Sequence, residues 1–239
     1  MAYLQQRTDA WFKARRGKLT ASNFAAALGV SPYTSRQKLV RTMGGDSWAP
    51  TAIPTNIACA WGTSNEPNGI MKYMAATGNV VQTEWFVAHP TLDWLGGSPD
   101  GLVDNDGMIE VKCPYKQEIY DPGVPAHYYP QVNGLMEICD RNWCDFVVWT
   151  PEKVHITRLK RNQNAWNYFL PYYMEMYMHH VRGDSPARTK SEDKKKMLEM
   201  IHMFIAEDTI DPSPPKRPTD LQLYLSDEDR NVCQRTDSD

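Results

Sequence analysis

Two acidic residues and a lysine lie close together in the segment GGSPDGLVDNDGMIEVKCP. Asp100 lies at a turn just before Gly101, and Glu110 and Lys112 belong to the strand-like stretch MIEVK. Side chains two residues apart on a strand point to the same face, so Glu110 and Lys112 share one face while Val111 packs into the core. The short Asp-Gly hairpin between the two stretches can bring Asp100 alongside them.

This residue set suits the hydrolysis of a phosphodiester. Two carboxylates on one wall form a hard-oxygen site for Mg²⁺, with Mn²⁺ as a substitute. Such a metal polarises the phosphate and lowers the pKa of water, while a nearby cation positions that water and offsets charge. The same pattern also fits a surface hairpin in which Glu110 and Lys112 form a solvated pair. On these residues alone both interpretations are open.

The elements that must position these residues indicate a mixed α/β chain, with helices around an antiparallel β-meander. Three N-terminal helices are expected before residue 45, with Asp9, Thr20 or Ser22, and Ser35 as their caps. Residues 59–78 predict a fourth helix. We expect later strands at 79–88, 95–103, 107–113, 144–150 and 154–160, and later helices at 126–139 and 162–180.

Charge and composition restrict the class of protein. The 239-residue chain has a net charge of −3 and a pI near 6.1, which disfavours a protein that coats DNA but allows an enzyme with one basic channel. Its five cysteines form no CxxC pair, which argues against a disulfide framework and a structural zinc site. No apolar run or signal peptide predicts a membrane partner, so we expect a cytoplasmic location, or a host nucleus for a eukaryotic virus.

Four motifs occur in the order known from one nuclease family. They are WFKARRGKLTAS, then WGTSNEP, then GSPDG with IEVK, and finally YYPQVNGLM. Together they resemble the PD-(D/E)XK nuclease superfamily, and within it the lambda-exonuclease or YqaJ-like viral recombinase branch. The resemblance covers about residues 8–160. It implies a restriction-endonuclease-like core, in which a central mixed sheet is flanked by helices and preceded by N-terminal helices.

The resemblance implies roles for the residues of the hairpin. Asp100 and Glu110 would bind the metal, assisted by the main-chain carbonyl of Val111. Lys112 would position or activate the attacking water. Glu66, in the second motif, matches an acidic residue that helps to hold a second metal or its waters.

Three further positions match family residues that lie near the DNA. Gln131 matches a polar helix residue close to the metal site, and Arg15 and Ser22 match a pocket that holds a 5′-phosphate. A hydroxyl at a helix N-terminus beside a guanidinium suits an anion. Simpler interpretations are open for each: Glu66 could favour a helix N-terminus, Ser22 could only cap its helix, and Arg15 and Gln131 could be ordinary surface residues.

The activity that the resemblance implies is Mg²⁺-dependent 5′-to-3′ exonuclease action on double-stranded DNA ends, which produces single-stranded DNA for recombination or repair. A single-strand annealing protein and a homotrimer ring are the implied partners. Structure-specific or alkaline-nuclease-like endonucleases share the core, and a DNA-binding module with an inactive site is the non-enzymatic alternative. We expect residues 1–183 to form the lambda-exonuclease-like nuclease domain, and residues 184–239 to form a helical and Pro-rich, partly flexible tail.

Overall fold

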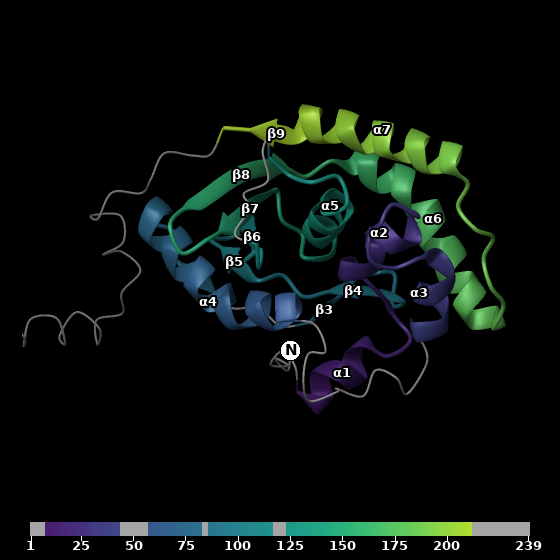
Figure 1. Ribbon diagram of the computed structural model, residues 1–239. Helices are drawn as coiled ribbons and strands as arrows, with labels where there is room; N and C mark the ends of the chain where they lie inside the picture. Colours follow the sequence, from purple (N-terminus) through teal and green to yellow (C-terminus); the bar gives the residue numbers. More distant parts are fainter. Residues whose placement is uncertain (1–7, 44–56, 83–85, 117–122, 212–239) are drawn as a thin grey trace, which may run out of the picture.

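A central sheet of six strands organises the protein. The computed structural model describes residues 8–43, 57–82, 86–116 and 123–211 (Figure 1). Within these ranges β6 and β7 pair in parallel and all other neighbouring strands of the sheet are antiparallel. The mixed sheet expected from the sequence is therefore present, and its strands in spatial order are β2 (Val81–Gln82), β5 (Gly101–Val103), β6 (Gly107–Lys112), β7 (Trp143–Trp149), β8 (Val154–Lys160) and β9 (Thr209–Ile210).

A smaller sheet lies beside the first and consists of β1 (Leu19–Thr20), β4 (Leu95–Gly97) and β3 (Val87–Ala88). The expectation of one strand over residues 95–103 was wrong, because Pro99 has no N–H for a strand ladder and the chain changes sheet there. Residues 79–88 are also divided between the two sheets, with residues 83–85 outside the described part.

Helices cover both faces of the large sheet (Figure 1). One face carries α4 (Ile57–Thr77), which packs on alternate residues of the strands, including Ile109, Val111 and Val147. The opposite residues of the same strands face a larger core built with the other helices. These are α2 (Phe24–Ala27) after the 3₁₀ turn η1 (Ala21–Asn23), α3 (Arg36–Met43), α5 (Tyr129–Ile138), α6 (Gln163–Arg182) and α7 (Ser191–Asp208), whereas α1 (Asp9–Arg15) adds no side chain to this core.

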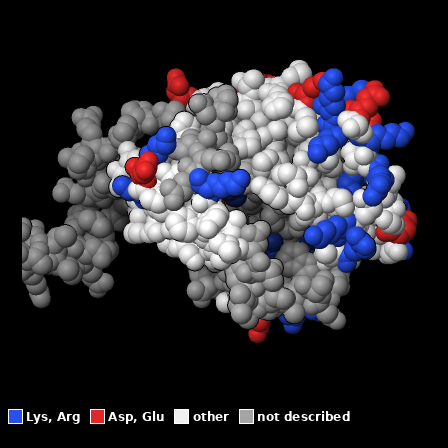
Figure 2. Space-filling model, viewed as in Figure 1, with Lys and Arg blue, Asp and Glu red and all other residues white. Residues whose placement is uncertain are grey.

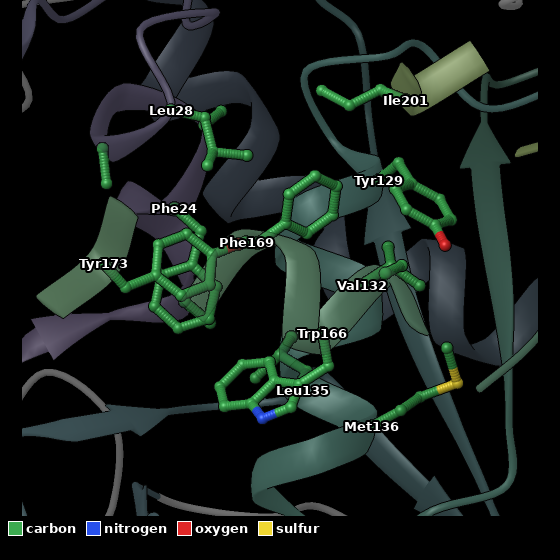
Figure 3. Packing of buried hydrophobic residues seen from close by; sticks show 14 of the residues in the cluster. Phe24, Leu28, Tyr129, Val132, Leu135, Met136, Trp166, Phe169, Tyr173 and Ile201 are labelled. Atoms are coloured by element: carbon green, nitrogen blue, oxygen red, sulfur yellow. The ribbon is translucent and has the colours of Figure 1, made fainter. Parts of the chain in front are cut away.

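Phe24 joins the N-terminal helices to α6 by aromatic stacking (Figure 3) and lies directly against α5. Phe24 of α2 stacks on Tyr173 of α6 with 4.1 Å between ring centroids. A Cβ at Gly134 of α5 would lie 2.3 Å from Cε2 of Phe24, so only glycine permits this approach of the two helices. The close approach of α5 to α2 therefore depends on the missing side chain of Gly134.

Two of the expected helix caps were wrong. Thr8, whose hydroxyl accepts from the Trp11 amide at 3.3 Å, caps α1, while Asp9 is already helical. Neither Thr20 nor Ser22 caps a helix with its side chain, because Thr20 bonds other side chains and Ser22 lies within η1. Ser35 does accept from the Lys38 amide at the start of α3, as expected.

The part of the C-terminal segment that the structure describes packs on the domain. β9 pairs with β8, and the buried carboxylate of Asp208 accepts hydrogen bonds from the Tyr129 hydroxyl and from the Asn162 amide. Residues 212–239 lie outside the described part. None of the described helices has the length and apolar character to cross a membrane.

Candidate active site

The β5–β6 hairpin brings Asp100 next to the end of β6. Gly101 pairs with Ile109, and the Asp100 Oδ2 atom accepts a 2.7 Å hydrogen bond from the Val111 amide. The expected turn is present, but its left-handed residue is Asp104 (φ +50°). Gly107 instead begins β6, where a Cβ would lie 2.1 Å from the Trp143 ring.

Glu110 is the centre of the cluster and is 1% exposed. Its Oε1 atom pairs with the Lys112 ammonium and accepts a 2.6 Å hydrogen bond from the Gln131 amide. Its Oε2 atom is buried and has no hydrogen-bond partner among the described residues. The interpretation of Glu110 and Lys112 as a solvated surface pair is therefore wrong, since the glutamate is enclosed and one oxygen lacks a partner.

Electrostatics at the cluster are governed by burial and by crowded acids. Burial, together with the nearby carboxylates of Asp100 and Glu66, raises the pKa of Glu110 to about 8, while the Lys112 ammonium opposes the shift. Burial alone would lower the pKa of Lys112, but the facing carboxylates of Glu110 and Asp100 outweigh it and raise that pKa. A divalent cation would relieve this repulsion between acidic groups.

Glu66 reaches the same site from α4. It lies in the middle of the helix that begins at Ile57, so the interpretation that it serves a helix N-terminus was wrong. Gly69, one turn later, lets α4 approach β6 closely, because a Cβ there would lie 2.6 Å from Cγ1 of Val111. The close packing of α4 explains why Glu66 acts electrostatically on Glu110.

Gln131 is held against Glu110 by the first turn of α5. Pro130 occupies the first turn of this helix, where its missing N–H leaves no internal bond unmade. The interpretation of Gln131 as an ordinary surface residue is wrong, because its amide contacts the buried glutamate.

Arg15 and Ser22 are joined through a residue that the sequence suggested only as a helix cap. The Arg15 guanidinium donates to the Thr20 hydroxyl at 3.2 Å, and the Thr20 and Ser22 hydroxyl oxygens lie 3.3 Å apart. Arg15 is buried over the Trp11 ring, at 4.1 Å, so it is not an ordinary surface arginine. Burial lowers the pKa of Arg15 to about 10, as expected for a cation that lacks full solvation.

We call Arg15, Thr20 and Ser22 the basic cluster, and Asp100, Glu110, Lys112 and Glu66 the acidic cluster. Trp11 connects the two. Its indole Nε1 donates a 3.0 Å hydrogen bond to the hydroxyl of Ser98, two residues before Asp100. Trp11 and Ser98 both lie inside the motifs quoted above, but nothing in the local sequence indicates that the two side chains meet. Their side chains meet only when α1 packs against the end of β4.

The donor set fits a magnesium ion with few protein ligands. The described residues contain no group of three or more His, Cys, Asp or Glu side chains arranged to hold a metal. Mg²⁺ in proteins is commonly bound by one or two carboxylates, with waters and substrate phosphates completing its coordination. Asp100 and Glu110 supply two such carboxylates, and the buried Oε2 atom of Glu110 lacks the partner that a cation would provide.

A carboxylate before one strand and a Glu-x-Lys pair on the next, on a mixed sheet, define the PD-(D/E)XK class of nucleases. Residues 10–142 match the model of the YqaJ-like viral recombinase domain. The chain belongs to this family, in the lambda-exonuclease branch, as the sequence motifs predicted.

Solved structures give the same assignment. The crystal structure of an alkaline exonuclease, LHK-Exo, from Laribacter hongkongensis is 27% identical, with a TM-score of 0.60 over 84% of this chain and 99% of that chain. The protein chain in the crystal structure of LHK-Exo in complex with dAMP is 26% identical in sequence, with a TM-score of 0.57. The match covers 84% of this chain and 97% of that chain. Among the curated proteins no match to the chain is found.

Proposed function

We propose that this protein is a Mg²⁺-dependent deoxyribonuclease that degrades one strand of duplex DNA from a 5′ end. The observation that carries the proposal is the state of Glu110, whose Oε1 atom is held by Lys112 and Gln131 while its Oε2 atom is buried without a described partner. Similarity to an alkaline exonuclease and membership of a recombinase family support exonuclease action in particular.

In this proposal each residue of the acidic cluster has one task. Asp100, Glu110 and the main-chain carbonyl of Val111 hold Mg²⁺, which when bound offsets charge on the phosphate and lowers the pKa of water. Lys112 donates a hydrogen bond that holds the attacking water in line with the phosphorus. Glu66 holds the waters of a second ion.

The basic cluster fits the terminal phosphate of the strand that is degraded. Arg15, Thr20 and Ser22 offer a guanidinium and two hydroxyls in one connected group, and burial strengthens the attraction of the guanidinium for an anion. The Trp11–Ser98 hydrogen bond fixes this group relative to Asp100. The proposal therefore gives the enzyme a preference for 5′-phosphorylated ends.

The proposed substrate and partners follow from the same assignment. A ring of three copies around duplex DNA would reconcile the net charge of −3 with DNA binding, because only the inner surface must be positive. The single strand that the enzyme leaves would pass to a single-strand annealing protein, in the cytoplasm or in a host nucleus.

A cleavage assay on matched substrates tests the proposal. Linear duplex DNA with a labelled 5′-phosphate is incubated with Mg²⁺ or EDTA, beside the 5′-hydroxyl form and a covalently closed circle. We expect loss of the linear strand with Mg²⁺ alone, a slower reaction at the hydroxyl end, and an intact circle. Lys112→Ala should be inactive, while Lys153→Ala, at the exposed β7–β8 turn, should be active.

Two outcomes would contradict this function in different ways. Cutting of the closed circle would favour the endonuclease alternative. Tight DNA binding without cleavage under Mg²⁺ or Mn²⁺ would favour a DNA-binding module with an inactive site.

A further inference from the structure

A line of aromatic rings leads away from Lys112. The Lys112 ammonium lies 4.9 Å from the centroid of the Tyr128 ring, and the His127 ring lies 4.1 Å from that of Tyr128. The next ring is Tyr33, with 5.7 Å between its centroid and that of His127. The Nε2 atom of His127 is buried without a hydrogen-bond partner among the described residues. The line therefore contains a polar group that a ligand could satisfy.

Tyr33 opens into a groove at the other end of this line. The groove has a volume of about 470 Å³ and lies between the loop before α3 and the connection from α6 to α7, with a lining that includes Ser31, Tyr33, Arg188, Thr189 and Lys194. We call it the Tyr33 groove. Tyr33 is 72% exposed, so its ring is accessible to a ligand in the groove.

Positive charge gathers around the Tyr33 groove. Figure 2 shows many Lys and Arg side chains, with some Asp and Glu among them, on the part of the surface where α3, the α6–α7 connection and the start of α7 lie. Arg188 and Lys194 are exposed and form no ion pair with a described residue, whereas the neighbouring Lys195 and Lys196 pair with acids on α7. The first two cations are therefore available for an anionic ligand.

An exposed aromatic ring beside uncompensated cations is the combination that binds single-stranded nucleic acid, because bases stack on the ring and phosphates face the cations. We propose that the Tyr33 groove binds a single DNA strand continuous with the strand at Lys112. The choice of DNA rests on the proposed function, and the location rests on the aromatic line and the charges. In this arrangement one base stacks on Tyr33, and Arg188 and Lys194 contact phosphates.

Binding without cleavage is the direct test. In EDTA, fluorescence anisotropy measures the affinity of the full-length protein for a labelled oligothymidylate of about 12 nucleotides. Tyr33→Ala should raise Kd about tenfold, while Tyr33→Phe, which keeps the ring, should bind like the wild type. The double variant Arg188→Ala/Lys194→Ala should reduce the slope of log K against log salt by about 1.4, which corresponds to two phosphate contacts.

Matched controls separate the groove from general surface effects. Tyr168→Ala removes another exposed tyrosine, on α6, and Lys195→Ala/Lys196→Ala removes the two paired lysines of α7. Both should bind like the wild type, and circular dichroism should show that every variant is folded. Wild-type affinity in Tyr33→Ala, or no binding by the wild type itself, would overturn the proposal.

The same samples separate failure of the groove from failure of the nuclease. A protein that binds the strand through Tyr33 but cleaves no DNA with Mg²⁺ would contradict the proposed function and support the groove. If the protein cleaves linear DNA but the Tyr33 and Arg188/Lys194 variants bind the strand as the wild type does, the proposed function is supported and the Tyr33 groove is contradicted.

Discussion

Gln131 donates a 2.6 Å hydrogen bond to the Oε1 atom of Glu110, the oxygen that also pairs with Lys112. A helix residue therefore fixes the rotamer of a strand residue 21 positions earlier in the chain. With Oε1 occupied, the buried Oε2 atom is the one left for another ligand. The orientation of Glu110 thus depends on where α5 begins.

Gln131→Ala should lower kcat about tenfold to a hundredfold, because a residue that orients a metal-binding carboxylate is lost. Gln131→Glu should lower it further, since a second carboxylate would face Glu110. Steady-state cleavage of linear duplex DNA measures both, with Gln163→Ala, an exposed glutamine at the start of α6, as control. Unchanged kcat in Gln131→Ala would show that Glu110 is held by other contacts.

Mg²⁺ should stabilise the folded protein in the absence of DNA, because it relieves repulsion between Asp100 and Glu110 and binds only the folded state. At ten times its Kd the gain is about 1.4 kcal/mol, seen as a higher Tm in calorimetry. Adding EDTA should reverse the shift. Glu110→Gln should abolish the response to Mg²⁺, and a full response in that variant would exclude Glu110 as a ligand.

Asp145→Ala should lower the free energy of unfolding by about 3–5 kcal/mol, because it removes the carboxylate that pairs with the buried Arg158 guanidinium. Asp145 is fully buried and accepts from Arg158 at 2.7 and 2.8 Å and from the Tyr73 hydroxyl at 2.7 Å. Urea denaturation measures the loss. Glu199→Ala, which removes an exposed partner of Lys195 on α7, should change stability by less than about 1 kcal/mol.

Tyr173→Phe should raise the free energy of unfolding by about 1 kcal/mol at neutral pH, since the Tyr173 hydroxyl is buried without a partner in the described part. Urea denaturation at pH 7 measures this gain. A destabilised Tyr173→Phe variant would mean that the hydroxyl is hydrogen-bonded after all.

The same substitution should change the response to alkali. Burial raises the pKa of Tyr173 well above its ordinary value of 10.0. The pKa of Tyr173 is higher in the folded protein than in the unfolded chain, so the folded protein loses stability when the unfolded chain begins to release this proton, above about pH 10. The loss is about 1.4 kcal/mol per pH unit. Denaturation between about pH 9 and pH 11 should show a shallower loss in Tyr173→Phe. An identical pH dependence in both proteins would contradict the buried phenol.

The alternation of β6 could be predicted because the side-chain direction of a strand repeats every two residues, so Glu110, Lys112 and the inward Val111 follow from local sequence alone. The division of residues 95–103 between two sheets could not, since it depends on which distant strands pair with each half. The hydrogen bond from Gln131 to Glu110 could not be predicted either, since it joins a helix and a strand that meet only in the folded protein.

The contacts within the basic cluster also could not be predicted from the sequence. Arg15 and Ser22 belong to one motif, but the bridging role of Thr20 depends on the 3₁₀ turn that follows it, where helix-capping rules predicted a side-chain cap. Side chains that join two elements are visible only after the elements are packed. Propensity and periodicity therefore predict which faces meet, while the residues that connect them come from the tertiary structure.

The position of the buried Asp208 late in the chain affects when the acidic cluster can form during synthesis. It accepts from Tyr129 and Asn162, so the helix that carries Gln131 is anchored by a residue 77 positions further along the chain. Domains fold as their segments leave the ribosome, N-terminal parts first. A nascent chain that ends before α7 lacks this anchor, and the complete anchor for the acidic cluster exists only after the last described helix has emerged.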